Sequence, residues 1–380
     1  MTDRDDSPSA DDRRLVLVAG AGRSGTSLMT GILAKLGMSV PQPEISADAT
    51  NPRGFSEPRW VVDFHVRLMR TRRLTSLDGR PNAIEMAAQA AADAEVAGTL
   101  RSWLEVQFVG ASQVVVKDPR IVWFLPLWQQ CARDLGIDTN IVTMLRYPTE
   151  VIASARTWYG DWQTDTSRAC GWINVMLETE RTTRELPRAY VGYSDLLTGW
   201  QAEVERVGAA LGIPSMVSVD PAAAADVDSF VDPGLRRQTV GWEGMGVPDR
   251  VQQLSEQVWN GLLAFRHGEA DGPSVDALDS WREAYVQLYT EAELIAQSTI
   301  RAAAKGAAGQ PGTKPAVAAR TPRSGSGPRP KGMRGKARGL ARSSARAAIA
   351  HPTARKLARW LRNKPVALAA YRRLQRMIGS

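Results

Sequence analysis

The sequence predicts an α/β fold in which a parallel β-sheet is flanked by helices. The first observation is the stretch 15–36, where the apolar run 15–18 is followed by a glycine-rich turn and then by apolar residues at helical spacing. Short apolar runs of this kind are typical of strands buried on both faces. Three more such runs occur, at 114–116, 141–145 and 189–192. Helical stretches separate them, and this alternation indicates a parallel sheet with helices on both faces.

The helices are predicted from apolar periodicity and from the signals at their ends. Gly37 and Gly212 end two of them, and Pro148 with Glu150 begins another. The segment 51–57 is predicted to be a loop. Helical patterns cover residues 28–36, 58–74, 79–110, 124–135, the stretch from 148, 166–185 and 194–211.

Composition divides the chain into an acidic body and a basic tail. Of the 380 residues, 43% are hydrophobic, which is enough for a large core, and the formal net charge is +8. Residues 301–380 contain 20 of the 48 lysines and arginines and none of the 40 acidic residues, so residues 1–300 have a net charge of −12. We therefore expect a disordered lead-in over 1–13, one domain over 14–300, a disordered basic linker over 301–345 and a basic amphipathic helical segment over 346–380.

Several classes of protein are disfavoured by the composition. The chain has no apolar run of 18 residues that would predict a transmembrane helix, and its polar, acidic N-terminus is unlike a signal peptide. Two cysteines without a CxxC pattern, and only three histidines, argue against a metal site or a disulfide framework. A cytoplasmic protein without a metal is expected.

The glycine-rich turn after the first strand is a candidate anion site. Its backbone N–H groups and the N-terminus of the following helix converge, and their partial positive charge favours a phosphate group. An arginine inside the turn adds a full positive charge. The candidate phosphate ligands are Gly22, Arg23, Ser24, Gly25, Thr26 and Ser27.

Two known nucleotide-binding patterns match this turn only in part. Gly20, Gly22 and Gly25 satisfy G-x-G-x-x-G, but that pattern also requires a second strand where the stretch 38–44 contains two prolines. A Walker A loop requires lysine at the position of Thr26. A purely structural turn between strand and helix is a further interpretation.

A second candidate phosphate site follows the third strand. Arg146 ends that strand, and Ser154 lies about two helical turns later, so the two side chains can share one phosphate. Arg23, Lys117 and Tyr193 likewise follow the first, second and fourth predicted strands. Ligands of open parallel sheets bind beyond the C-terminal ends of the strands, and these side chains are therefore expected to meet there.

Six stretches of the chain resemble, in their sequence and in their order, the bacterial family of sulfotransferases that use 3′-phosphoadenosine 5′-phosphosulfate (PAPS). The resemblance extends from residue 15 to about residue 260. Arg23 stands where many members carry lysine; arginine keeps the charge and adds bidentate geometry, but it does not donate a proton. The stretches are Arg23–Ser27, Asn51–Glu57, Val116–Arg120, Leu145–Pro148 with Ser154, Val191–Leu197 and Phe230–Arg237.

The resemblance implies the P-loop-like sulfotransferase fold and in-line transfer of a sulfuryl group from PAPS to an acceptor hydroxyl, without a metal. Arg23 would stabilise the charge that grows on the bridging oxygen, and Thr26 and Ser27 would bind phosphate oxygens. Arg146 and Ser154 would bind the 3′-phosphate. Further residues expected to contact the nucleotide are Tyr193, Arg236 and Arg237. The alternative for the two arginines is that they are ordinary charged residues of the surface.

The transfer needs a base to take the proton of the acceptor. Glu57 is the first candidate, because the resemblance implies a glutamate or histidine in this role; its alternative is a carboxylate that stabilises the start of a helix. His65 is the second candidate, with a packed histidine as its alternative. Lys117 would either pair with Asp118 or help to hold the sulfonate.

By family analogy alone, the acceptor is expected to be a carbohydrate or a glycolipid. Two other functions remain open, namely a P-loop kinase that uses ATP and Mg²⁺ and a non-catalytic protein that binds a nucleotide or a membrane.

The basic tail has its own predicted partner. Aliphatic and aromatic residues alternate with arginine and lysine over residues 353–378, which is typical of a segment that binds an anionic membrane surface. A polyanionic glycan, a solvated tail and, less expected, a nucleic acid are the alternatives. The protein would then be peripheral on the inner face of the membrane.

Overall fold

The computed structural model describes residues 13–160, 162–232, 234 and 240–309. The chain divides into two units, residues 1–309 and 310–380, and the described residues all lie in the first. All but residue 13 of the predicted lead-in lies outside the described residues. The same is true of the linker from residue 310 and of the whole basic segment at 346–380.

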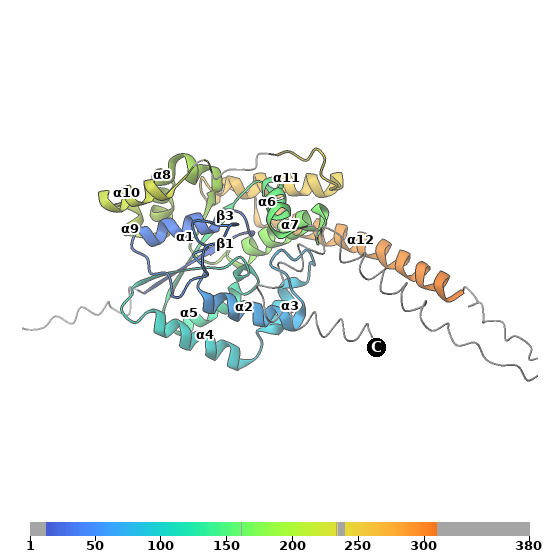
Figure 1. The fold of residues 1–380 in the computed structure, drawn as a ribbon, viewed down its shortest axis with the longest axis horizontal. Coiled ribbons are helices and arrows are strands. Elements are labelled where there is room, and N and C mark those ends of the chain that lie inside the picture. The colour runs from blue at the N-terminus through green and yellow to red at the C-terminus, as the bar shows by residue number, and fades with distance from the viewer. Residues whose placement is uncertain (1–12, 161, 233, 235–239, 310–380) are drawn as a thin grey trace, which may run out of the picture. The chain divides into compact units, whose positions relative to one another are not determined.

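A sheet of four parallel strands forms the centre of the first unit (Figure 1). The strands are β1 (Arg14–Ala19), β2 (Gln113–Lys117), β3 (Asp138–Leu145) and β4 (Arg188–Gly192), in the order β2-β1-β3-β4. β1 pairs with both neighbours, so that Leu15 lies between Val114 and Thr139. The predicted α/β class is confirmed. Because all four strands are parallel, their C-terminal ends meet at one edge.

Helices cover both faces of this sheet (Figure 1). One face packs against α1 (Thr26–Lys35), α8 (Tyr193–Leu211), α9 (Pro214–Val217) and α10 (Pro221–Phe230). The other face packs against α2 (Arg59–Arg72), α3 (Ala83–Ala90), α4 (Ala94–Gln107), α5 (Leu125–Asp134), α7 (Asp165–Thr182) and α11 (Asp249–Ala264). The remaining elements are α6 (Pro148–Tyr159), α12 (Val275–Gly309) and the short 3-10 helices η2 (Ile121–Trp123) and η4 (Glu269–Asp271).

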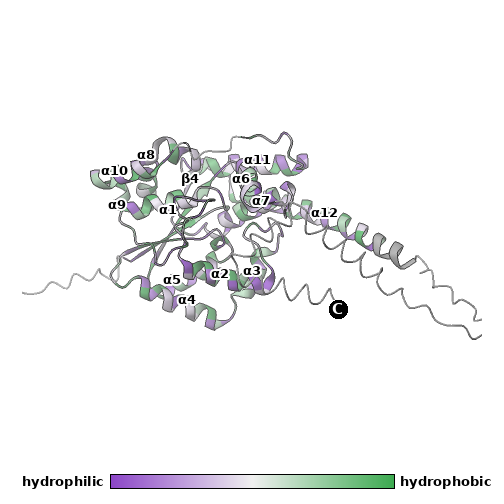
Figure 2. Ribbon diagram, viewed as in Figure 1, coloured by the Kyte–Doolittle hydropathy of each residue, from purple (hydrophilic) through white to green (hydrophobic). Residues whose placement is uncertain are grey.

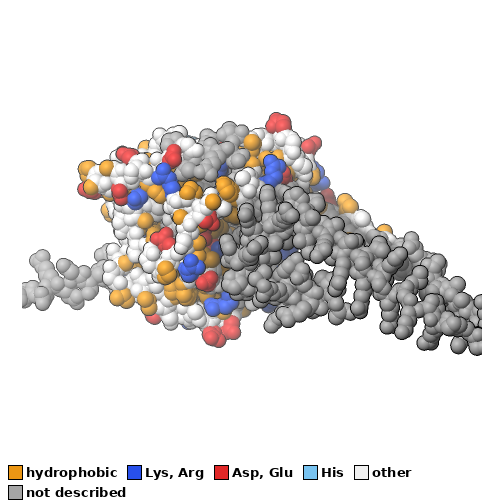
Figure 3. Space-filling model, viewed as in Figure 1, with side chains coloured by type: hydrophobic (Ala, Val, Ile, Leu, Met, Phe, Trp, Pro, Cys, Tyr) orange, Lys and Arg blue, Asp and Glu red, His pale blue; other side chains and the backbone are white. Residues whose placement is uncertain are grey.

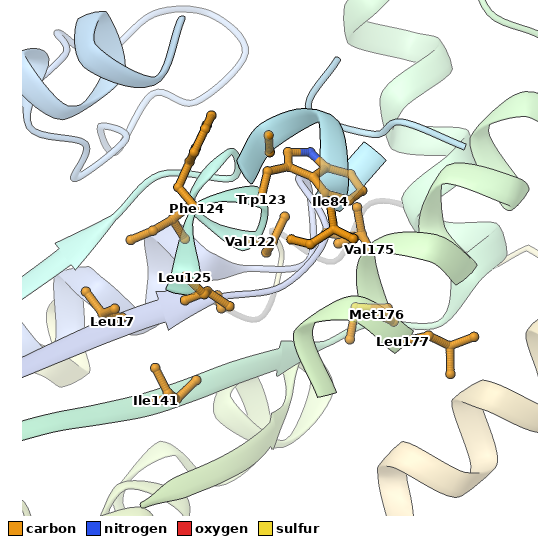
Figure 4. Packing of buried hydrophobic residues seen from close by; sticks show 14 of the residues in the cluster. Leu17, Ile84, Val122, Trp123, Phe124, Leu125, Ile141, Val175, Met176 and Leu177 are labelled. Carbon is orange, nitrogen blue, oxygen red and sulfur yellow. The ribbon is translucent and has the colours of Figure 1, made fainter. Parts of the chain in front are cut away.

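The two-residue period of the strands produces two separate cores. In β1, Leu15 and Leu17 belong to the cluster under α2–α5, whereas Val16 and Val18 belong to the cluster under α1 and α8. Trp123 fills the first cluster, next to residues of α3 and α7 (Figure 4). Hydrophobic residues alternate with hydrophilic ones along the covering helices (Figure 2), as expected for helices that bury one side.

The structure differs from the predicted elements at three boundaries. The alanine-rich stretch 79–110 contains two helices, because Asp93 caps α4 by accepting the N–H of Glu95 at 2.9 Å and thereby starts a new helix. β3 begins at Asp138, since its polar first residues still pair with β1. α12 continues to Gly309, past the predicted domain boundary at 300, and the alanines at 302–304 favour this extension.

The surface of the described residues is mixed in character. Charged side chains of both signs lie between apolar ones on the face drawn in Figure 3. α12 is anchored by the buried Leu278 and Tyr285, whereas Leu294, Ile295 and Ile300 further along it are 59%, 69% and 66% exposed. Within the described part of the chain, no helix is long and apolar enough to cross a membrane.

Candidate functional site

The glycine-rich turn is shaped by two glycines with left-handed backbones. Gly20 has φ 119°, and a Cβ there would lie 2.6 Å from the carbonyl oxygen of Met144 in β3. Gly25 has φ 90°, and a Cβ there would overlap the ring of Tyr193. Both positions therefore require glycine for conformation and for space. Arg23 also has a positive φ of 74°, which a non-glycine residue adopts only at a cost.

The turn presents several donors that no side chain of the described residues satisfies. Gly25 is the N-cap residue of α1 and supplies no side-chain acceptor, so the first amides of the helix remain open to an anion. The hydroxyl of Ser24 is fully buried and has no hydrogen-bond partner among the described residues. An unsatisfied buried hydroxyl is costly.

Arg23 joins the turn to α6. Its Nε donates to Oγ of Ser154 at 3.1 Å, and its Nη2 donates to the carbonyl oxygen of Thr50 at 3.3 Å. The guanidinium carbon lies 6.0 Å from the ring centre of Tyr159, at the C-terminal end of α6. The two predicted phosphate ligands Arg23 and Ser154, which are far apart in the sequence, are therefore in direct contact.

Arg146 lies in the same cluster and is buried. Its Nη1 donates to the carbonyl oxygen of Arg23 at 2.9 Å, and its Nε donates to Oε2 of Glu150 at 3.0 Å. Its guanidinium stacks over the ring of Tyr193 at 4.5 Å from the centre. The residues that follow the C-terminal ends of the strands β1, β3 and β4 thus converge, as the sequence predicts. The sequence places Glu150 only at the start of a helix, although its spacing of four residues from Arg146 is typical of an ion pair.

Lys117 forms a second buried cluster beside the turn. Its ammonium group contacts Oε1 of Glu57 at 2.6 Å, Oγ of Ser27 at 3.0 Å and the carbonyl oxygen of Phe55 at 3.2 Å. Oγ of Ser27 also accepts an N–H from the side chain of Asn51 at 3.2 Å. Glu57 and Lys117 are only 7% and 2% exposed. Sequence reasoning missed Asn51 as a contact of the turn, although it begins one of the six resembling stretches.

His65 lies in the core, and its prediction as a base is corrected by its contacts. The residue is fully buried. Nε2 accepts the indole N–H of Trp128 at 2.9 Å, and Nδ1 lies 2.8 Å from Oδ2 of Asp118. Because an indole nitrogen only donates, Nδ1 must carry the imidazole proton and donate it to Asp118. Both nitrogens are therefore occupied, and His65 cannot take a proton from an acceptor at the strand ends.

Asp118 is held by the same network rather than by Lys117. Burial raises its pKa, but the hydrogen bond from His65 and the neighbouring Arg120 guanidinium outweigh this effect, so its pKa lies below the usual carboxyl value. Arg120 donates to Oδ1 of Asp118 through Nη1 at 2.6 Å and through its backbone N–H at 3.1 Å. Of the two roles predicted for Lys117, the pairing with Asp118 is not observed; its partner is Glu57.

Replacing Trp128 by phenylalanine should destabilise the protein, because the buried Nε2 of His65 loses the indole N–H that it accepts. We expect Trp128→Phe to cost about 1–3 kcal/mol more in the free energy of unfolding than Trp172→Phe. Trp172 is a matched control, because it is equally buried and its indole N–H has no partner in the described structure. Urea unfolding of both variants gives the comparison, and equal losses would show that the hydrogen bond contributes nothing.

The loop 51–57 also touches the segment that precedes residues 235–239. Arg53 donates to the carbonyl oxygens of Ser229 and Phe230, and its guanidinium lies 3.4 Å from Oδ2 of Asp232. The predicted nucleotide ligands Arg236 and Arg237 lie outside the described residues, and so the structure does not place them. Among the residues that it does place, no group of three or more histidine, cysteine, aspartate or glutamate side chains could hold a metal ion.

Fold and site together define an α/β protein with three cationic side chains, Arg23, Lys117 and Arg146, gathered around a glycine-rich turn at the C-terminal edge of a parallel sheet. No family profile matches the chain. A comparison with curated proteins also finds no match.

Solved structures with a similar course of the chain are sulfotransferases, but the similarity is low. The sulfotransferase domain of the Synechococcus olefin synthase has a TM-score of 0.39 and 18% identity, over 67% of this chain and 96% of that one. The sulfotransferase domain of the curacin biosynthetic pathway has a TM-score of 0.38 and 13% identity, over 66% and 98%. A sulfotransferase from Mycobacterium tuberculosis has a TM-score of 0.36 and 12% identity, over 66% and 77%.

Proposed function

We propose that this protein is a sulfotransferase that moves a sulfuryl group from PAPS to an acceptor hydroxyl. The observation that carries the proposal is the environment of the Ser27 hydroxyl. Both of its lone pairs accept N–H groups, from Lys117 and from Asn51, so its own hydrogen remains to be donated. A hydroxyl polarised in this way is suited to donate its hydrogen to an anionic oxygen of PAPS.

The same arrangement disfavours a Mg²⁺-dependent kinase. In P-loop kinases and ATPases the hydroxyl at this position binds Mg²⁺ through a lone pair. Here an ammonium group lies 3.0 Å from that oxygen and would repel a divalent cation. Such enzymes also have a lysine at the position of Thr26, and threonine does not supply the cation that would bind the phosphates of ATP.

The residues around the turn fit the two charged ends of PAPS. The open amides of α1, the hydroxyls of Thr26 and Ser27 and the guanidinium of Arg23 would hold the 5′-phosphosulfate, together with Gly22, Ser24 and Gly25 of the turn. Arg146 and Ser154, which both contact Arg23, would hold the 3′-phosphate. The ring of Tyr193 stacks against the guanidinium of Arg146. Arg236 and Arg237 stay predicted ligands of the nucleotide.

The reaction itself would be an in-line displacement at sulfur. The acceptor oxygen forms a bond to sulfur while the bond from sulfur to the bridging oxygen breaks, and 3′-phosphoadenosine 5′-phosphate (PAP) leaves with the electron pair. The amides of the turn, Arg23 and Lys117 stabilise the charge on the leaving phosphate. Glu57 takes the acceptor proton, since it is the carboxylate in contact with Lys117 beside the turn.

Two exposed aromatic residues support a sugar as acceptor. Tyr159 and Trp162 are 53% and 66% exposed, and Tyr159 lies beside Arg23. Flat amphipathic rings offer an apolar face and a polar edge, which suits the face of a sugar ring. A carbohydrate or glycolipid hydroxyl is therefore the proposed acceptor.

Membrane attachment is proposed on separate grounds. The exposed Leu294, Ile295 and Ile300 of α12 come shortly before the basic stretch 301–380. Apolar side chains next to a cluster of positive charge favour an anionic lipid surface. Sedimentation of the full chain with vesicles containing phosphatidylglycerol at low salt, but not with neutral vesicles, would support it; absence of binding to both would refute it.

Calorimetry with two nucleotides distinguishes the sulfotransferase from the kinase. We expect PAP to bind without a metal at micromolar or tighter affinity, and ATP with Mg²⁺ to bind at least about a hundredfold more weakly, because only PAP places phosphates at both sites. A preference for Mg²⁺-ATP would refute the proposal. A non-catalytic protein that only binds nucleotides is distinguished by the rate at which PAPS is converted to PAP. For such a protein, the wild type would convert PAPS no faster than the Glu57→Gln variant.

A further inference from the structure

The ammonium group of Lys117 has no N–H left for a ligand. A lysine carries three donors, and the structure assigns all three, to Glu57, Ser27 and the carbonyl oxygen of Phe55. The side chains of Lys117 and Glu57 are 3% and 9% exposed. An anion that enters the turn and contacts this ammonium must therefore displace one of its three acceptors.

Electrostatics decides which acceptor leaves. The Ser27 hydroxyl and the Phe55 carbonyl are neutral, and neither repels an incoming phosphate or sulfonate. The carboxylate of Glu57 carries the same charge sign as the donor and would lie close to it around one ammonium group, where repulsion is strong in a buried site. The arriving anion also replaces Glu57 as counter-charge, so Lys117 stays paired throughout.

We propose that binding of the sulfuryl donor displaces Glu57 from Lys117 and thereby makes Glu57 available as the base. This inference rests on the function proposed above. Before the donor binds, the ammonium group donates to Oε1 of Glu57 at 2.6 Å and occupies the oxygen that would otherwise accept a proton. After the donor binds, Glu57 has lost its cation and can accept the proton of the acceptor hydroxyl. Lys117 is thus both a ligand of the donor and the switch that controls the base.

The proposal makes a prediction that a simple structural role does not. Glu57→Gln keeps the shape of the side chain but replaces the charged acceptor by a neutral one that is easier to displace. Calorimetry with PAP should show about tenfold tighter binding by Glu57→Gln than by the wild type, because the donor no longer competes with a carboxylate for Lys117. Transfer of the sulfuryl group should nevertheless be lost.

Two further variants make the result decisive. Glu44→Gln removes the same charge from the same stretch between α1 and α2, but its carboxylate contacts the side-chain amide of Gln42 rather than a cation. The affinity of this variant for PAP should therefore stay within about twofold of the wild type. In a Lys117→Met background, adding Glu57→Gln should give a smaller gain in affinity, because the competition for the ammonium group is then absent and only the repulsion between carboxylate and phosphate is removed. Equal or weaker binding of PAP by Glu57→Gln, or the same gain in the Lys117→Met background, would overturn the proposal. Failure of the wild type to bind PAP would instead refute the proposed function itself.

Discussion

Replacing Arg146 by alanine should weaken the binding of PAP by at least about a hundredfold. Arg146 is buried, and its guanidinium is fixed by Glu150, by the carbonyl oxygen of Arg23 and by the ring of Tyr193. A cation that is already oriented pays little entropy when it binds a phosphate. Its removal also leaves the buried carboxylate of Glu150 without this cation. Calorimetric titration of the purified full chain with PAP measures the effect.

Two control variants separate binding from folding in this experiment. Arg101→Ala removes an arginine of α4 whose ion pair with Asp134 is exposed, and its affinity for PAP should stay unchanged. Arg146→Lys keeps the charge near Glu150 but loses the planar, two-sided geometry of the guanidinium, so an intermediate affinity is expected. Wild-type affinity in Arg146→Ala, with a folded protein by circular dichroism, would contradict the assignment of the 3′-phosphate site.

Replacing Gly25 by alanine should destabilise the protein by more than about 3 kcal/mol and abolish the binding of PAP. The backbone of Gly25 is left-handed, and a methyl group there would overlap the ring of Tyr193. The ring cannot turn away freely, because it is buried and carries the guanidinium of Arg146. One methyl group would therefore disturb both proposed phosphate sites. Urea unfolding and calorimetry with PAP measure the two effects.

Gly37→Ala is the matched control for this variant. Gly37 also has a left-handed backbone, with φ 95°, but a Cβ there would meet no atom within 4 Å. Only the backbone strain should remain, at about 1 kcal/mol, with unchanged affinity for PAP. If both variants lose the same stability and both bind PAP, the contact between the turn and Tyr193 has no role in the site.

Most of the fold follows from simple patterns in the sequence. The strand-forming runs are short, apolar and separated by helical periodicity, and this combination leaves few arrangements other than a covered parallel sheet. The boundaries that differed depend on single polar groups. The break at Asp93 comes from one capping hydrogen bond, and the early start of β3 comes from its pairing with β1. Neither boundary is marked by a pattern of apolar residues in the sequence.

The site was partly accessible from the sequence for the same physical reason. Arg23, Lys117, Arg146 and Tyr193 each follow a strand, and parallel strands bring such residues to one edge. The partners of these residues were not accessible, because they depend on side-chain directions across the fold. Lys117 could equally have paired with its neighbour Asp118, and His65 gave no sign that Trp128 and Asp118 would occupy both of its nitrogens.

The most direct test of the proposed function is a transfer assay with two labelled donors. The full chain is incubated with a glycolipid and carbohydrate extract and either PAPS labelled in its sulfuryl group or Mg²⁺-ATP labelled in its γ-phosphoryl group. We predict that label enters the extract from PAPS alone, without added metal, and that Glu57→Gln and Arg146→Ala abolish this incorporation. Incorporation of label from ATP, and none from PAPS, would contradict the account.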